Sequence, residues 1–249
     1  MLFRGAAATA VLAGAALAQS SDASTEIADA LLQYQAQGLI PDPIAQDESS
    51  LSSAVRLSYS GQNTTTGQRF TLPADKTTIS AYPSWLLDVP SKEQASYQSK
   101  SFSAMLVDPG AAGQTLGGSL VTRHYLANHL KYSNGALTNS SGGLDIQTYT
   151  APGPAAGSGA HRYLALVFDE GDDFEAPESL DSAGTQLSNM TLSEYIDSFN
   201  IGKIVAMSFL LVEDTSSGEQ TFTNTAAIPS ASVAAAVSSV AVSTSCSHG

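Results

Sequence analysis

The chain has 249 residues, of which 43% are hydrophobic and 13% are charged, enough to bury a core in one domain. Its 23 Asp and Glu against 10 Lys and Arg give a formal net charge of -13, which opposes binding to the phosphate backbone of nucleic acids. The single cysteine, Cys246, excludes an internal disulfide and a cysteine-based metal cluster. We expect no nucleic-acid partner, no metal and no other cofactor.

Residues 1–18 predict a secretory signal peptide. Arg4 precedes a run of small and apolar residues that ends at Ala18, which is typical of a leader cleaved there. The run is too short for a transmembrane helix, and no later stretch approaches the roughly 20 apolar residues that such a helix needs. We therefore expect a secreted chain, extracellular or associated with the cell wall, without a transmembrane segment.

Residues 19–228 predict one folded domain that opens with a helix. Ile27, Leu31 and Tyr34 recur at helical spacing, and Gly38 follows as a stop. Four later runs, alternating or continuously apolar between turn residues, predict the strands of a β core. These runs are Ser101–Asp108, Thr122–Leu130, His161–Glu170 and Lys203–Asp214.

Three acceptor triplets for N-glycosylation lie in polar, turn-like surroundings. They begin at Asn63, Asn139 and Asn189. Together with the signal peptide, they indicate a glycoprotein that passes through the secretory pathway.

An acidic stretch runs from Asp169 to Asp181. Its spacing does not follow the calcium-binding loop of an EF-hand, so we expect a solvated surface that keeps the protein soluble.

A second helix is predicted after residue 190. Thr191 and Glu194 form a capping box ahead of apolar residues at helical spacing, and Gly202 stands where a C-terminal stop is expected. From Pro229 the composition collapses to Ser, Ala and Val, which predicts a disordered or O-glycosylated tail over residues 229–249. A C-terminal lipid anchor is the weaker alternative, because the final residues are polar.

Few residues point to chemistry. The chain lacks a Gly-rich phosphate loop with a lysine, a paired-histidine zinc helix and the G-x-S-x-G motif of hydrolases. Asp108 ends an apolar strand, a costly place for an unpaired carboxylate, and His124 and His161 each lie beside a tyrosine in strand-like segments. If these three converge, Asp108 would orient an imidazole whose other nitrogen donates to an oxyanion. The alternative is that both histidines are only structural.

The order of several segments resembles a known family. The segments are AMLVDPGAA (104–112), RHYLAN (123–128) and YTAPGPAAGSGAHRYLALVFDE (149–170), preceded by LIPDPI (39–44). They resemble the phosphatidylethanolamine-binding proteins, also known as the Raf-kinase-inhibitor and flowering-regulator family. LIPDPI is similar to the secreted fungal-type members.

The resemblance implies a mainly β fold of two packed antiparallel sheets with peripheral α-helices. It also implies a shallow pocket for a phosphate-type anion or a phospholipid headgroup. Matched residue by residue, the pocket is formed by Asp108, His124, Pro154, His161 and Tyr163. The chain departs from the family pattern at Gly110 and Ala112, where an acid and a proline are usual, and at Thr122, where an aromatic residue is usual.

The resemblance implies a binding protein rather than an enzyme, with no catalytic residue. Inhibition of a serine carboxypeptidase is a function of the fungal branch, so a protease is a candidate partner. Two alternatives stay open. One is a hydrolase in which His124 or His161 acts as a base oriented by Asp108. The other is a cell-surface structural protein whose pocket is vestigial.

Overall fold

The computed structural model describes residues 23–40, 43–45, 49–112, 120–139, 143–198 and 200–218. The expected signal peptide (1–18) and the tail (229–249), with its alternative of a lipid anchor, lie outside these residues. Within the described ranges, no helix is both long and apolar enough to cross a membrane.

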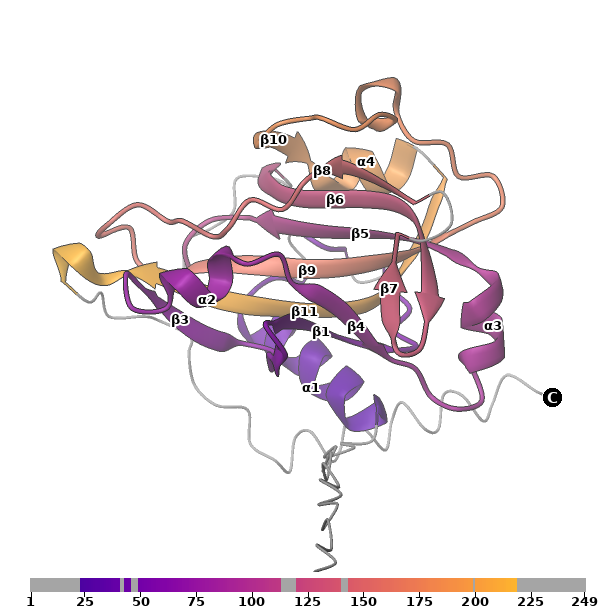
Figure 1. Ribbon diagram of the computed structural model, residues 1–249, viewed down its shortest axis with the longest axis horizontal. Helices are drawn as coiled ribbons and strands as arrows, with labels where there is room; N and C mark the ends of the chain where they lie inside the picture. Colours follow the sequence, from indigo (N-terminus) through magenta and orange to yellow (C-terminus); the bar gives the residue numbers. More distant parts are fainter. Residues whose placement is uncertain are drawn as a thin grey trace, which may run out of the picture.

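The described chain is mainly β, with short helices around the strands (Figure 1). The helices are α1 (Ala23–Ala36), α2 (Lys76–Ser80), α3 (Gln94–Ser99) and α4 (Leu192–Ser198), with 3-10 turns η1 (Glu178–Leu180) and η2 (Thr215–Ser217). The first strands are β1 (Ala54–Tyr59), β2 (Gln62–Asn63), β3 (Gln68–Leu72), β4 (Ser84–Asp88) and β5 (Ser101–Asp108). They are followed by β6 (Leu120–Ser133), β7 (Ala136–Thr138), β8 (Leu144–Gln147), β9 (His161–Glu170), β10 (Ser188–Thr191) and β11 (Ile201–Asp214).

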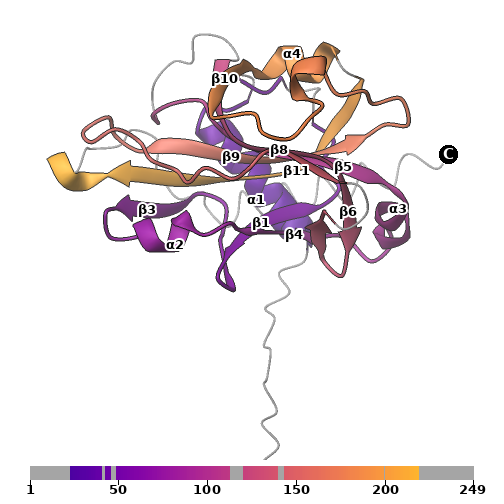
Figure 2. The ribbon, with the colours of Figure 1, turned by 45° about the horizontal axis from the view of Figure 1, so that its top comes forward.

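The strands follow one curled path in the order β2-β1-β4-β7-β6-β5-β9-β11-β3, and β8 and β10 also pair with β6. Figure 2 shows β1 and β4 as a layer on one side of the central β5, β9 and β11, with α4 and β10 on the other side. The long strand β6 joins the layers, because it pairs with β5 over most of its length and with β7 through Lys131–Ser133.

The central strands are buried on both faces. Phe102, Ala104 and Leu106 of β5 pack in a core shared with β1 and β4, while Met105 and Val107 pack in a second core with α1 and α4. Side chains of a strand alternate between the two faces of a sheet, so a sheet covered on both faces needs apolar residues throughout. This double burial explains the continuous apolar runs of β9 and β11.

The mainly β fold expected from the sequence is confirmed. Two predicted strands, Ser101–Asp108 and His161–Glu170, have the bounds of β5 and β9. Of the other two, β6 is longer than predicted at both ends, and β11 begins two residues earlier than predicted. One pair differs from the expected antiparallel arrangement: β3 lies parallel to β11, with Gln68 opposite Leu210. Sequence pattern reports which residues are buried but carries no direction for a partner strand, so this pair could not be predicted.

The first predicted helix is confirmed as α1, and the second is α4. The role assigned to Gly202 was wrong, because this glycine lies within β11. A Cβ atom at Gly202 would overlap the Asp169 carbonyl oxygen, so the close approach of two strands requires glycine there. The left-handed residue after α4 is Asn200, with φ 52°.

The acidic stretch divides at the end of β9. Its later members are exposed, as expected; they are Asp172, Asp173, Glu175, Glu178 and Asp181. Glu170 is instead buried, and its carboxylate accepts hydrogen bonds from the Ser103 hydroxyl (2.6 Å) and the His129 amide (2.8 Å). In the described residues, no three His, Cys, Asp or Glu side chains are grouped to hold a metal ion.

Candidate functional site

The end of β5 and the start of β9 bring Asp108 and His161 together. The two strands are antiparallel neighbours, with Val107 opposite Leu164, so the end of β5 lies near the start of β9. Asp108 Oδ2 is 2.8 Å from His161 Nδ1, and Asp108 Oδ1 accepts a hydrogen bond from the Gly110 amide at 2.7 Å. Both oxygens of this carboxylate at the strand end therefore have a hydrogen-bond partner, which offsets the cost of placing a charge there.

A β-bulge in β6 positions His124. Leu106 of β5 pairs with Tyr125, but the next residue, Val107, pairs with Arg123, so His124 is an extra residue in β6. Residues paired across strands share a face, so the bulge gives Arg123 and Tyr125 opposite faces of the sheet. The His124 ring lies edge-on to the ring of Tyr163, with 5.0 Å between the centroids.

The protonation of His124 is set by its surroundings. Nδ1 lies 3.0 Å from the Thr150 carbonyl oxygen, which can only accept, so Nδ1 carries the hydrogen. Burial lowers the pKa of His124 below 6.5, although the Thr150 hydrogen bond and the negative charge of Asp108 oppose this effect. The neutral ring therefore predominates at pH 7 and presents the lone pair of Nε2.

Tyr163 and Pro154 complete the expected set. The Tyr163 hydroxyl accepts a hydrogen bond from the Gly153 amide at 3.2 Å, and the next residue, Pro154, is buried. Burial and the charge of Asp108 raise the pKa of Tyr163, so its phenol stays neutral. The residues expected from the sequence thus gather at one end of β5, β6 and β9, through the pairs Asp108–His161, His124–Tyr163 and Tyr163–Gly153.

Ser158 is a member of the cluster that sequence reasoning missed. Its Oγ lies 3.0 Å from His161 Nε2 and 2.7 Å from the Ala155 carbonyl oxygen. Serine, His161 and Asp108 therefore form a continuous hydrogen-bonded chain. The signal in the sequence was the Gly-Ser-Gly turn just before His161, whose glycines Gly157 and Gly159 have φ of 79° and 84°.

Arg162 is a positioning residue that was also missed. Its side chain is buried and donates to three backbone carbonyl oxygens, those of Gln37 (3.0 Å), Ala111 (3.0 Å) and Gly110 (3.4 Å). These bonds tie the loop after Asp108 to the turn that ends α1. An arginine within the apolar run of β9 was the available signal.

The three acceptor asparagines are exposed. Asn63 lies in β2, and Asn139 follows β7 and donates to Asp145 at 3.3 Å. Asn189 lies in β10 and accepts a hydrogen bond from the Thr122 hydroxyl at 2.9 Å. Their exposure is compatible with attached glycans, and glycosylation at these positions stays a prediction.

A family model described as phosphatidylethanolamine-binding protein matches residues 51–208. The chain belongs to this family. The match spans Asp108, His124, Pro154, His161 and Tyr163, so the cluster lies inside the region that defines the phosphatidylethanolamine-binding proteins (PEBPs).

Three solved structures share the fold. A carboxypeptidase Y inhibitor crystallised with its cognate proteinase superposes with a TM-score of 0.58 at 18% identity, over 79% of this chain and 98% of that chain. The PEBP of Plasmodium falciparum gives 0.53 at 15% identity, over 74% and 96%. The PEBP of Plasmodium vivax gives 0.52 at 13% identity, over 74% and 97%. No curated protein matches the chain significantly.

Proposed function

We propose that this PEBP-family protein binds a small phosphate-type anion, including the phosphate of a phospholipid headgroup, at Asp108, His124, His161 and Tyr163. The observation that carries the proposal is the pair of histidines held by acceptors on Nδ1. Asp108 holds His161 at 2.8 Å, and the Thr150 carbonyl holds His124 at 3.0 Å. Each ring is thereby oriented with Nε2 available to an oxyanion or to Ser158.

Binding of an anion requires a proton on Nε2 of His124. Burial lowers the pKa of this ring, so the His124 ring is neutral at pH 7 in the free protein and takes up a proton as the anion binds. The affinity for phosphate should therefore strengthen as the pH falls from 8 towards the lowered pKa of the free His124 ring, which lies below the ordinary value of about 6.5.

Calorimetric titration with inorganic phosphate and with phosphoethanolamine tests the proposal. We expect the double variant His124→Ala/His161→Ala to lose binding, and His129→Gln, a histidine outside the cluster, to bind as the parent does. Vesicles containing phosphatidylethanolamine separate a lipid ligand from a free anion. An affinity that stays constant between pH 5 and pH 8, or binding that survives the double variant, would refute the proposal.

Inhibition of a serine carboxypeptidase is the finer part of the proposal. Its support is the shared fold with the carboxypeptidase Y inhibitor, together with the signal-peptide pattern that would deliver the chain to a secretory compartment. Titration of a secreted serine carboxypeptidase with the purified protein should abolish activity near a 1:1 ratio. Full activity at a tenfold excess would exclude inhibition. N-terminal sequencing of the secreted protein tests cleavage after Ala18.

Ester hydrolysis is a second candidate, favoured by the chain Ser158–His161–Asp108. In that reaction Ser158 Oγ would attack an acyl carbon, its proton would pass to His161 Nε2 and then to the leaving alcohol, and water would release the acid. The hydroxyl must first turn from the Ala155 carbonyl, to which it now donates. Turnover of p-nitrophenyl acetate that is lost in Ser158→Ala, and kept in the exposed control Ser80→Ala, would support it. Equal rates in both variants would reject it.

A further inference from the structure

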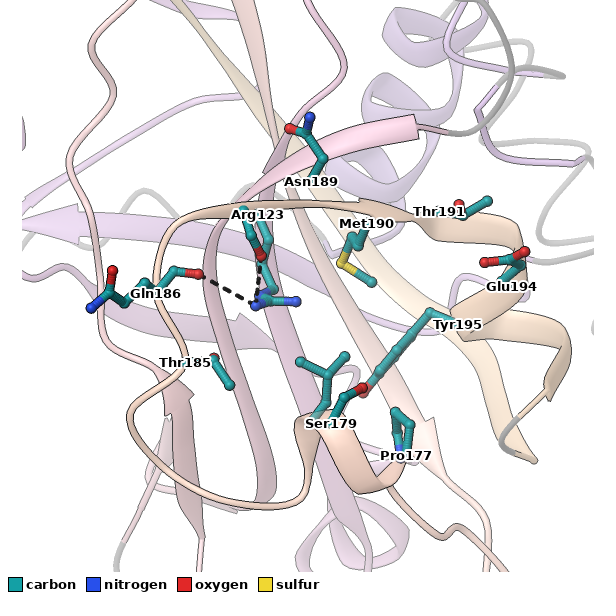
Figure 3. Close-up of a pocket in the computed structure, with 12 residues that line it drawn as sticks. Arg123, Pro177, Ser179, Thr185, Gln186, Asn189, Met190, Thr191, Glu194 and Tyr195 are labelled. Atoms are coloured by element: carbon teal, nitrogen blue, oxygen red, sulfur yellow. Dashed lines mark hydrogen bonds between the residues drawn. The ribbon is translucent and has the colours of Figure 1, made fainter.

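A cavity of about 600 Å³ lies on the face of β6 opposite the phosphate-type site. It is open to solvent and is lined by residues of β6, η1, β10, α4 and the segment between η1 and β10, as Figure 3 shows. Because of the bulge at His124, Arg123 lies on the face of the sheet opposite Tyr125, whereas His124 contacts Tyr163 in the phosphate-type site. We refer to this space as the Arg123 cavity.

Arg123 is a buried cation, 4% exposed, at the wall of this cavity. Nε donates to Gln147 Oε1 at 2.7 Å, and Nη2 donates to Ser188 Oγ at 3.2 Å and, at the limit of hydrogen bonding, to the Gln186 carbonyl at 3.5 Å. All three acceptors are neutral. Within the described residues the guanidinium pairs with no carboxylate, and Nη1 has no hydrogen-bond partner.

The orientation of the guanidinium is fixed. The Gln147 amide accepts from Arg123 Nε through its oxygen and donates from Nε2 to the Arg123 carbonyl oxygen at 2.7 Å, so the amide is held at both atoms and orients the guanidinium. Figure 3 shows the remaining end of the guanidinium directed into the space between Met190 and Tyr195. A buried charge without a counter-ion is costly, so this arrangement favours an anion supplied from outside the chain.

The other residues that line the cavity indicate that the ligand has an apolar part. Pro177, Leu180, Met190 and Tyr195 give the cavity apolar walls. Of the three large hydrophobic side chains that the described residues expose, two, Leu120 (56%) and Leu187 (48%), flank β10 beside the cavity. The volume lies within the range of small-molecule sites.

We propose that the Arg123 cavity binds an amphipathic monocarboxylate, with its carboxylate on Arg123 and its apolar body against Leu180 and Met190. A single negative charge is favoured for two reasons. The cavity offers one cation, and the acid in its lining, Glu194, would repel a dianion such as a phosphate monoester. This proposal is independent of the proposed phosphate-type site.

Decanoate is the probe. Decanol serves as a control that lacks the negative charge, and acetate as a control that lacks the apolar chain. Calorimetry on unglycosylated protein should detect decanoate and neither control. We expect Arg123→Gln to weaken decanoate binding at least tenfold, on the order of one lost charge-assisted hydrogen bond. Glu194→Gln should strengthen it by about twofold to threefold. The matched control Arg56→Gln, an arginine paired with Glu26 away from the cavity, should bind as the parent does.

Two further measurements separate this cavity from the phosphate-type site. The His124→Ala/His161→Ala variant should keep decanoate binding, and excess inorganic phosphate should not displace decanoate. If Arg123→Gln fails to fold, as judged by circular dichroism, two other variants test the proposal. Glu194→Gln should bind decanoate more tightly, and Met190→Glu should lose decanoate binding. The proposal is overturned if decanoate does not bind, if decanol binds equally well, if phosphate competes, or if the Arg123 or Glu194 variants leave the affinity unchanged.

Discussion

Arg162 offers the sharpest test of how the fold supports the site. In Arg162→Lys the charge is kept, but a single ammonium cannot reach three carbonyl oxygens that the planar guanidinium now serves at 3.0, 3.0 and 3.4 Å. The Gly110 carbonyl keeps the Arg162 backbone amide as a donor at 3.3 Å, so the loss falls on the buried carbonyls of Gln37 and Ala111, which two different nitrogens of the guanidinium now serve. An unsatisfied buried acceptor costs about 1–3 kcal/mol, and a hydrogen bond from a charged group contributes about 1.5–3 kcal/mol. We expect a loss of about 3 kcal/mol in the free energy of unfolding.

Urea unfolding followed by circular dichroism measures this loss. With a slope of about 2 kcal/mol per molar urea, the midpoint should fall by about 1.5 M. The same substitution at Arg56, whose partners Glu26 and Asp88 are also partly exposed, should cost less than about 1 kcal/mol. Phosphate affinity should fall in Arg162→Lys alone, because the loop after Asp108 loses its anchor. Equal midpoints for the two variants would refute the role given to Arg162.

Three further predictions concern packing and pH. Gly202→Ala should destabilise the protein by about 3 kcal/mol in urea, because its Cβ meets the backbone of Asp169; a change under about 1 kcal/mol would contradict the close approach. Tyr34→Phe should cost about 1 kcal/mol, since the buried Ser208 carbonyl loses a donor at 2.7 Å, and an unchanged midpoint would show that water replaces it. The pKa of His124 is lower in the folded than in the unfolded chain, so the unfolded chain binds more protons below about 6.5 and stability should fall as the pH falls through that region. Urea midpoints of His124→Gln against pH should lack this contribution, and parallel profiles would disprove it.

The central strands could be predicted from the sequence because strands buried on both faces consist almost entirely of apolar residues. β5 and β9 are buried on both faces, so every position is constrained and the bounds follow from the flanking turns. The layer of β1 and β4 was not predicted, since the mixed polar and apolar residues of a short strand signal little without a partner. The parallel pair of β3 and β11 depends on contacts distant in the chain.

The sequence indicated which residues form the candidate site, but not how they contact one another. Asp108, His124 and His161 were indicated by their places in strand-like segments, and the resemblance to the PEBP family added Tyr163 and Pro154. The bulge at His124 is a property of register between β5 and β6, which alternation within one strand cannot report. For the same reason, alternation would place Arg123 on the face of Tyr125 and conceal the cavity behind it. Ser158 was passed over because a serine in a serine-rich chain carries little information by itself.

The length of β6 has a consequence for how the protein unfolds. A strand that ends within one layer allows that layer to open alone, whereas β6 continues from its pairing with β5 into its pairing with β7. Separating the two layers would require β6 to lose its backbone hydrogen bonds to β5 or to β7 part-way along its length. Backbone amides of β6 next to β5 and next to β7 should therefore exchange with solvent through one shared opening event, and the two layers should behave as a single cooperative unit.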